Sequence, residues 1–103
     1  MGEFLLTYDI RSTHPDAHSI FIEMAGKCGW SKWILTVDDL ESELPNTTLY
    51  GIFNDLADAD SALEKALSLT AKKIRQPVKI EKWVICPIGT ALLVTDKTRN
   101  PSD

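Results

Sequence analysis

The sequence of 103 residues predicts one α+β domain in which an antiparallel sheet carries two helices on one face. Two segments, 17–28 and 59–74, have apolar residues at helical spacing. Four segments rich in β-branched and aromatic residues flank them, in the order strand, helix, strand, strand, helix, strand. With 44% hydrophobic and 25% charged residues, the composition excludes a disordered chain and a coiled coil.

Residues 4–10 predict the first strand, around which the remaining elements pack. Its residues alternate between two faces, with Leu6, Tyr8 and Ile10 on one and Leu5, Thr7 and Asp9 on the other. A strand that is apolar on both faces is central, or has one face covered by helices and the other by a partner. We therefore expect a central strand that places Asp9 among buried residues.

Helical spacing predicts the first helix from Pro15 to Cys28, with Thr13 or His14 near its N-cap and Gly29 as its stop. The second helix is expected to start near Asp58 or Asp60, with Ser61 and Glu64 as a capping box, and to end before Pro77. Its apolar stripe comprises Ala59, Ala62, Leu63, Ala66, Leu67, Thr70 and Ile74. Its exposed stripe comprises Ser61, Lys65, Ser68, Lys72 and Arg75.

The other strands are expected at 30–37, 47–54 and 78–86, with an acidic connection over 38–46. Gly51 marks a bulge or the close approach of another backbone. The element order is that of the ferredoxin-like split βαβ sandwich, βαββαβ, with a short extra C-terminal strand at 90–95. Residues 1–95 thus form one domain, and 96–103 a flexible tail. Apolar residues beyond what two helices cover predict a homodimer, with segment 90–95 paired across it.

Charge is segregated along the chain, whose net charge is −4. Residues 1–60 carry three bases and eleven acids, whereas residues 61–103 carry eight bases and four acids. Two explanations fit this split: solvated faces whose charges happen to segregate, or one continuous basic surface. The candidate contacts for DNA or RNA are Lys65, Lys72, Lys73, Arg75, Lys79 and Lys82. Tyr50, Trp30 and Trp83 are candidates for stacking on bases, although tryptophan is more often a core residue.

The run Tyr8-Asp9-Ile10 at the end of the first strand, together with the element order, resembles one superfamily. It contains the CRISPR spacer-acquisition nuclease-like subunits, the virulence-associated D proteins and related antitoxins that cleave messenger RNA. The resemblance implies that Asp9 is catalytic and holds a divalent metal such as Mg²⁺ near a dimer axis. Two departures stand against it, since Arg11 alone represents the basic residues expected after the aspartate, and Leu35-Thr36-Val37 replaces a serine-phenylalanine step. The competing interpretation is that Asp9 caps the following loop.

Other polar residues favour solvated or structural roles. His14 and His18 have helical spacing but lack a third metal ligand, and the acids Asp38, Asp39, Glu41 and Glu43 lack the glycine of a calcium loop. Cys28 and Cys86 are expected to be reduced core thiols. The chain has no apolar run long enough for a bilayer and no signal peptide, which predicts a cytoplasmic protein without membrane partners.

Three functions follow from these patterns. The first is a dimeric nucleic-acid-associated binding protein, either a regulator or an antitoxin-like module, that uses the basic face of the second helix. The second is a metal-dependent nuclease or endoribonuclease centred on Asp9. The third is an adaptor that binds another protein through the open face of its sheet. The acidic surroundings of Asp9, with only Arg11 nearby as a base, favour binding over catalysis.

Overall fold

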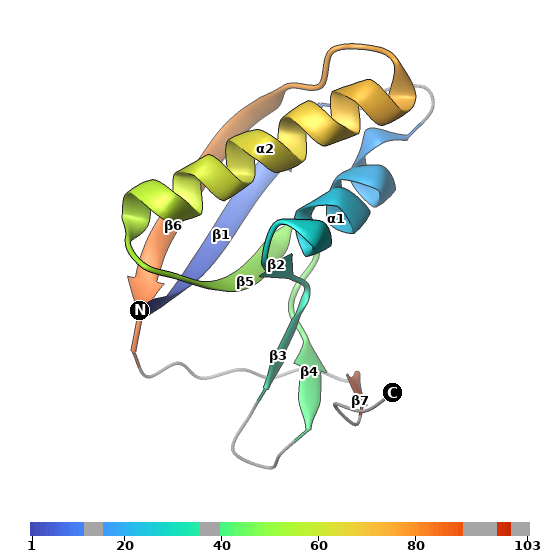
Figure 1. The fold of residues 1–103 in the computed structure, drawn as a ribbon. Coiled ribbons are helices and arrows are strands. Elements are labelled where there is room, and N and C mark those ends of the chain that lie inside the picture. Colours follow the sequence, from blue (N-terminus) through green and yellow to red (C-terminus); the bar gives the residue numbers. More distant parts are fainter. Residues whose placement is uncertain (12–15, 36–39, 90–96, 100–103) are drawn as a thin grey trace.

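The computed structural model describes residues 1–11, 16–35, 40–89 and 97–99. In these ranges two helices lie on one face of an antiparallel sheet, and a smaller sheet projects from it (Figure 1). The predicted α+β class is therefore confirmed. The elements are β1 (Gly2–Ile10), α1 (Ala17–Lys27), β2 (Trp30–Ser31), β3 (Trp33–Leu35), β4 (Glu41–Glu43), β5 (Thr48–Phe53), α2 (Leu56–Ile74), β6 (Ile80–Ile88) and β7 (Thr98–Arg99).

β1 is a central strand of the main sheet, whose order is β2-β5-β1-β6. It pairs antiparallel with β5 on one side and with β6 on the other. Phe4, Leu6 and Tyr8 point toward the helices and are buried, whereas Asp9 is exposed on the opposite face. The predicted central strand is confirmed. The expected burial around Asp9 is wrong, because two-residue periodicity turns this carboxylate away from the core.

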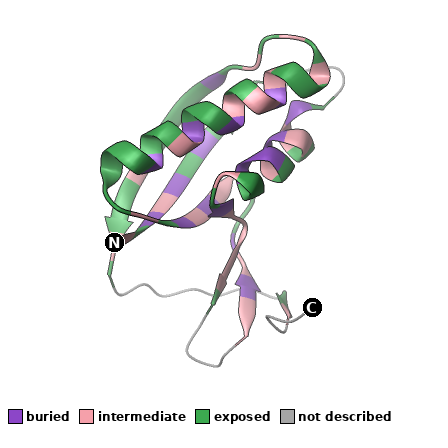
Figure 2. Cartoon of the chain, viewed as in Figure 1, coloured by how far each residue is buried: buried purple, intermediate pink, exposed green. Residues whose placement is uncertain are grey.

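The core lies between the main sheet and the two helices (Figure 2). Its largest fully buried side chains are Trp30, Phe21, Leu6, Leu49, Leu63 and Thr70. The Thr70 hydroxyl donates to the carbonyl oxygen of Ala66 at 2.7 Å, so this buried polar group is satisfied within its own helix. Each large side chain contributes on the order of 2–5 kcal/mol relative to alanine.

The first helix begins after Asp16, whose Oδ1 accepts a hydrogen bond from the backbone N–H of His18 at 3.1 Å. Asp16 is thus the N-cap, and the residues expected in that role, Thr13 and His14, lie outside the described residues. The helix ends at Lys27, and Gly29 follows with a φ of 104°. Glycine adopts this left-handed conformation without strain, which confirms the predicted stop.

The second helix begins earlier than the sequence predicted. Asp55 is its N-cap, and Oδ1 of Asp55 accepts from the backbone N–H of Asp58 at 2.9 Å. The expected start at Asp58 or Asp60 is wrong, because the first of three closely spaced aspartates takes the cap. Arg75 ends the helix in the left-handed conformation, with φ 59° and ψ 37°.

The predicted strand over 30–37 is divided at Lys32. Its first part, β2, joins the main sheet, while β3 pairs with β4, which pairs in turn with β7. We call β3, β4 and β7 the arm; it lies below the main sheet in Figure 1. β4 falls in the expected acidic connection and β7 in the expected tail, whereas segment 90–95 lies outside the described residues. The strands are thus divided between two sheets, and the βαββαβ order is not confirmed as such.

Gly51 lies where two backbones approach each other, as predicted. A Cβ atom at this position would lie 2.9 Å from the carbonyl oxygen of Gly29 and closer still to the ring of Phe53. Glycine therefore lets β5 pass close to the turn between α1 and β2. Neither described helix is long and apolar enough to cross a membrane.

Candidate nucleic-acid interface

The second half of α2 and the connection to β6 carry five exposed cations. These are Lys65, Lys72, Lys73, Arg75 and Lys79, and none of them forms an ion pair with a carboxylate of the described residues. We call this set the α2 cations. Lys65 and Lys72 are seven residues apart and share one face of the helix. Arg75 is the C-cap of α2 and Lys79 directly precedes β6. The C-terminal end of α2 lies at the end of the molecule where α1 begins (Figure 1).

The C-terminal end of a helix attracts positive charge, which offers a structural explanation for part of this set. Lys72 and Lys73 lie in the last turn of α2 and interact favourably with its dipole. The effect falls off within one turn, so it does not account for Lys65, nor for Lys79, which lies outside the helix. A role in binding accounts for all five.

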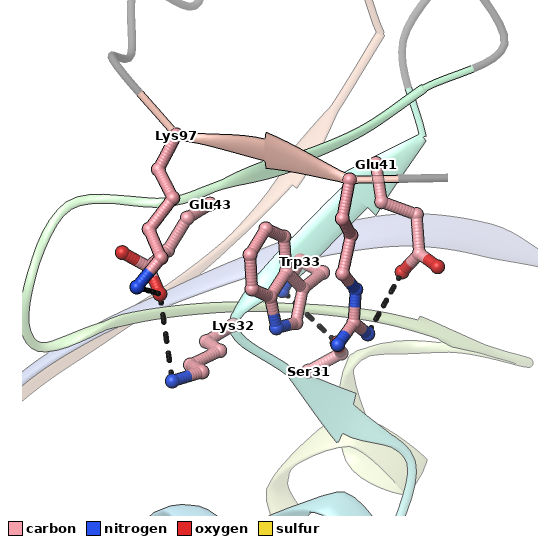
Figure 3. A network of polar contacts seen from close by, with 7 residues as sticks. Ser31, Lys32, Trp33, Glu41, Glu43 and Lys97 are labelled. Carbon is pink, nitrogen blue, oxygen red and sulfur yellow. Dashed lines mark hydrogen bonds and ion pairs between the residues drawn. The ribbon is translucent and has the colours of Figure 1, made fainter. Parts of the chain in front are cut away.

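Of the other side-chain cations in the described residues, Lys32, Lys97, Arg99 and Arg11 each have a carboxylate partner, whereas Lys27 and Lys82 do not. In the arm, Lys32 lies 3.4 Å and Lys97 3.9 Å from Oε2 of Glu43 (Figure 3). Arg99 lies 3.3 Å from Oε2 of Glu41, and its guanidinium stacks on the ring of Trp33, 4.1 Å from the centroid. Arg11 lies 3.9 Å from Oε2 of Glu81. The α2 cations differ from these residues because they have no such carboxylate.

Lys82, the sixth predicted contact residue, is exposed but does not join the α2 cations on one surface. It pairs with Asp9 across β6 and β1, and paired residues of an antiparallel sheet project to the same face. Because Asp9 lies on the face opposite the helices, Lys82 does too. The structure therefore separates Lys82 from the cations of α2.

Asp9 lies in an open cleft of about 560 Å³ at the end of β1. The residues that line it are Asp9, Ile10, Arg11, Asp16, His18, Thr47, Glu81 and Lys82. Its charges are of both signs. The carboxylate of Asp16 caps α1 by accepting a hydrogen bond from the backbone N–H of His18, and the carboxylate of Glu81 faces Arg11. The cleft brings the predicted catalytic Asp9 beside two cations, Arg11 and Lys82.

Within the described ranges, no three histidine, cysteine, aspartate or glutamate side chains gather as a group that could hold a metal ion. Nε2 of His18 lies 3.0 Å from the hydroxyl oxygen of Tyr8, and the two rings meet edge to face. His18 thus has a structural role, half-buried and bonded to Tyr8, while His14, Asp38 and Asp39 lie outside the described residues. Asp9 is thus not part of such a group among the described residues.

The three aromatic candidates for base stacking differ in exposure. Trp30 is fully buried, with an exposed fraction of 0%. Tyr50 is half-buried, and its hydroxyl donates to Oε1 of Glu3. Trp83 is 50% exposed, which makes it the accessible candidate. The stacking of Arg99 on Trp33 was missed, because the two residues are far apart in the sequence.

Neither helix covers the second face of the main sheet. Ile52 on β5 and Val84 on β6 are 53% and 59% exposed, and Leu5 lies between their strands. We call this surface the open sheet face. Cys86, which pairs with Leu5, is an exposed free thiol rather than the expected core residue, whereas Cys28 is half-buried and also free.

The comparisons with known proteins add no relatives to this description. No protein-family model, no curated protein and no solved structure matches the chain.

Proposed function

We propose that the chain is a ferredoxin-like nucleic-acid-binding protein that acts as a homodimer, and that the α2 cations contact phosphate groups. One observation carries the proposal: these five cations lack carboxylate partners among the described residues, whereas those of the arm and Arg11 each have one. Unpaired, exposed cations are free to replace the counterions of a nucleic-acid backbone.

The fold assignment rests on the main sheet. Its order β2-β5-β1-β6 is antiparallel, with α1 following β1 and α2 following β5. Taken without the arm, this strand order supports a split βαβ sandwich. The arm is then an addition between the second and third strands of that pattern and at the C-terminal end.

Local charge, rather than total charge, is the basis of the proposed binding. The net charge of −4 disfavours binding by bulk electrostatics. Five phosphate contacts would make the affinity fall steeply with salt, with a slope of about −0.9 per contact for duplex DNA and about −0.7 for single strands. A homodimer presents the set twice.

A second copy of the chain is the proposed partner for the open sheet face. This face exposes Ile52 and Val84, with Glu3 near one end of β1 and Lys82 beside its other end. A two-fold axis that reverses the strand direction brings Lys82 of one copy toward Glu3 of the other and joins the apolar side chains of the two copies.

A fluorescence anisotropy titration with labelled DNA and RNA oligonucleotides, repeated over a series of salt concentrations, tests the binding. We expect affinity that falls linearly with the logarithm of salt. No salt-sensitive binding to any of these oligonucleotides would reject the proposal. Stoichiometric co-purification of another protein with no retained nucleic acid would favour the adaptor function instead.

A metal-dependent nuclease is the second candidate, because the cleft places Arg11 and Lys82 beside Asp9, where they would hold a phosphate. In this function, Asp9→Asn abolishes Mg²⁺-dependent cleavage of RNA or DNA and leaves the thermal midpoint unchanged. Cleavage that survives this substitution rejects Asp9 as the site.

A further inference from the structure

Trp83 is a large apolar side chain that the fold leaves half exposed. It is 50% exposed on β6, whereas Trp30, on the same sheet, is completely buried. It pairs with Tyr8 of β1, so it stands on the helix side of the sheet. An indole in this position keeps a π surface available to a planar partner.

The strand that carries Trp83 lies at an edge of the main sheet. β6 pairs with β1 on one side, and no strand of the described residues pairs with its other side. Figure 2 shows the strand as largely exposed. An unpaired strand edge offers backbone N–H groups as hydrogen-bond donors, in addition to its side chains.

Two cations precede Trp83 along this edge. Lys82 precedes it directly and projects to the open sheet face, and Lys79, one of the α2 cations, precedes β6. Two acids lie nearby, since Glu81 faces Arg11 at 3.9 Å and Asp9 pairs with Lys82 across β1 and β6. A polyanion that follows the edge therefore meets Lys79, Lys82 and the indole in succession.

We propose that Trp83 is a stacking platform for an unpaired base, and that the nucleic acid bound by this protein is single-stranded. The bases of a duplex are stacked on one another and closed to an edge-strand indole, whereas those of a single strand can be splayed onto it. The inference rests on the proposed nucleic-acid binding, and it names both the substrate class and the residue that selects it.

Substitution of Trp83 tests the platform by anisotropy with a single-stranded oligonucleotide and with its duplex. Trp83→Ala is expected to weaken single-strand binding by about fivefold to a hundredfold, while Trp83→Phe keeps most of the affinity. Leu56→Ala is the matched control, because Leu56 is a large apolar side chain that is 51% exposed at the start of α2, outside both the α2 cations and the open sheet face. It should leave the affinity unchanged. Far-UV circular dichroism verifies that each variant is folded.

Tryptophan fluorescence supplies an independent measurement. Stacking of a base should quench the emission of the wild-type protein, and Trp83→Phe should remove the quenching although Trp30 and Trp33 remain. If the wild type binds with salt sensitivity but prefers the duplex, or if Trp83→Ala changes nothing, the platform is rejected and the proposed function stands. If the wild type binds no nucleic acid, both are rejected.

Discussion

The hydroxyl oxygen of Tyr8 lies 3.0 Å from Nε2 of His18, which joins the central strand to the first helix beside the cleft. Burial raises the pKa of Tyr8 above its ordinary value, so the hydroxyl keeps its proton and can donate it to the imidazole. Tyr8→Phe should lower the free energy of unfolding by about 0.5–1.5 kcal/mol, because His18 loses its partner. Urea denaturation measures this loss. Tyr50→Phe, which removes a more exposed hydroxyl, is expected to cost less; an equal loss would contradict the role of the Tyr8–His18 pair.

Tyr50 should make the protein less stable at alkaline pH. Burial, the hydrogen bond to Glu3 and the negative charge of Glu3 together raise the pKa of Tyr50 from 10 to about 12. Between these values the folded state holds a proton that the unfolded state has released, so stability that is complete below pH 10 is lost as the pH rises toward 12. Tyr50→Phe should flatten this part of the profile of unfolding free energy against pH. Glu3→Gln should narrow the pH range over which stability is lost. An unchanged profile in both variants would contradict the assignment of this pH dependence to Tyr50.

Gly51→Ala and Gly26→Ala should have opposite effects on stability. At Gly51 the new Cβ would meet the Gly29 carbonyl and the Phe53 ring, and the overpacking should cost about 1–3 kcal/mol. At Gly26, within α1, no atom lies within 4 Å of the new Cβ, so the higher helix propensity of alanine should add about 0.5–1 kcal/mol. Thermal denaturation of the two variants measures whether the melting temperature falls for Gly51→Ala and rises for Gly26→Ala. Equal shifts would show that the close approach is not maintained in solution.

Lys72→Gln should weaken nucleic-acid binding and reduce the slope of log affinity against log salt by about 0.7 for a single strand. Lys27→Gln is the matched control, because Lys27 is also exposed and also lies in the last turn of a helix. Both substitutions remove one charge from a helix C-terminus, so their effects on stability should be similar. Equal losses of affinity would indicate bulk electrostatics rather than a contact surface on α2.

Val84→Glu should convert the proposed dimer to a monomer, since it places a charge in the apolar open sheet face. Leu56→Glu, at the start of α2, is the matched control, because Leu56 is 51% exposed and lies in the helix layer. Sedimentation equilibrium of the two variants and the wild type measures the change. A monomeric wild type, or a dimer in the Val84→Glu variant, would reject the open sheet face as the interface.

Local periodicity was sufficient to predict β1 as the central strand, the buried stripe of α2 and the stop at Gly29. Choices among equivalent residues were not predictable, since Asp55, Asp58 and Asp60 can each cap a helix and only the packing of α2 selects Asp55. The division at Lys32 also depends on distant partners, because β3 exists through its pairing with β4 and the stacking of Arg99 on Trp33.

The candidate site was predicted as a set of residue types but not as a surface. All six basic residues are exposed, as expected for contacts with a nucleic acid, yet the pairing of Lys82 with Asp9 places it across the sheet from α2. The register of two strands far apart in the sequence decides this, and no local pattern encodes it.

The position of β1 has a consequence for synthesis of the protein. Both strands that flank it, β5 and β6, come later in the chain, and β6 ends at Ile88. β1 therefore waits until β6 has been synthesised before its second edge is paired, and its apolar side chains stay accessible to chaperones during that time. Folding of this domain should accordingly be completed only after β6 has left the ribosome, with the closure of β6 onto β1 as the late step.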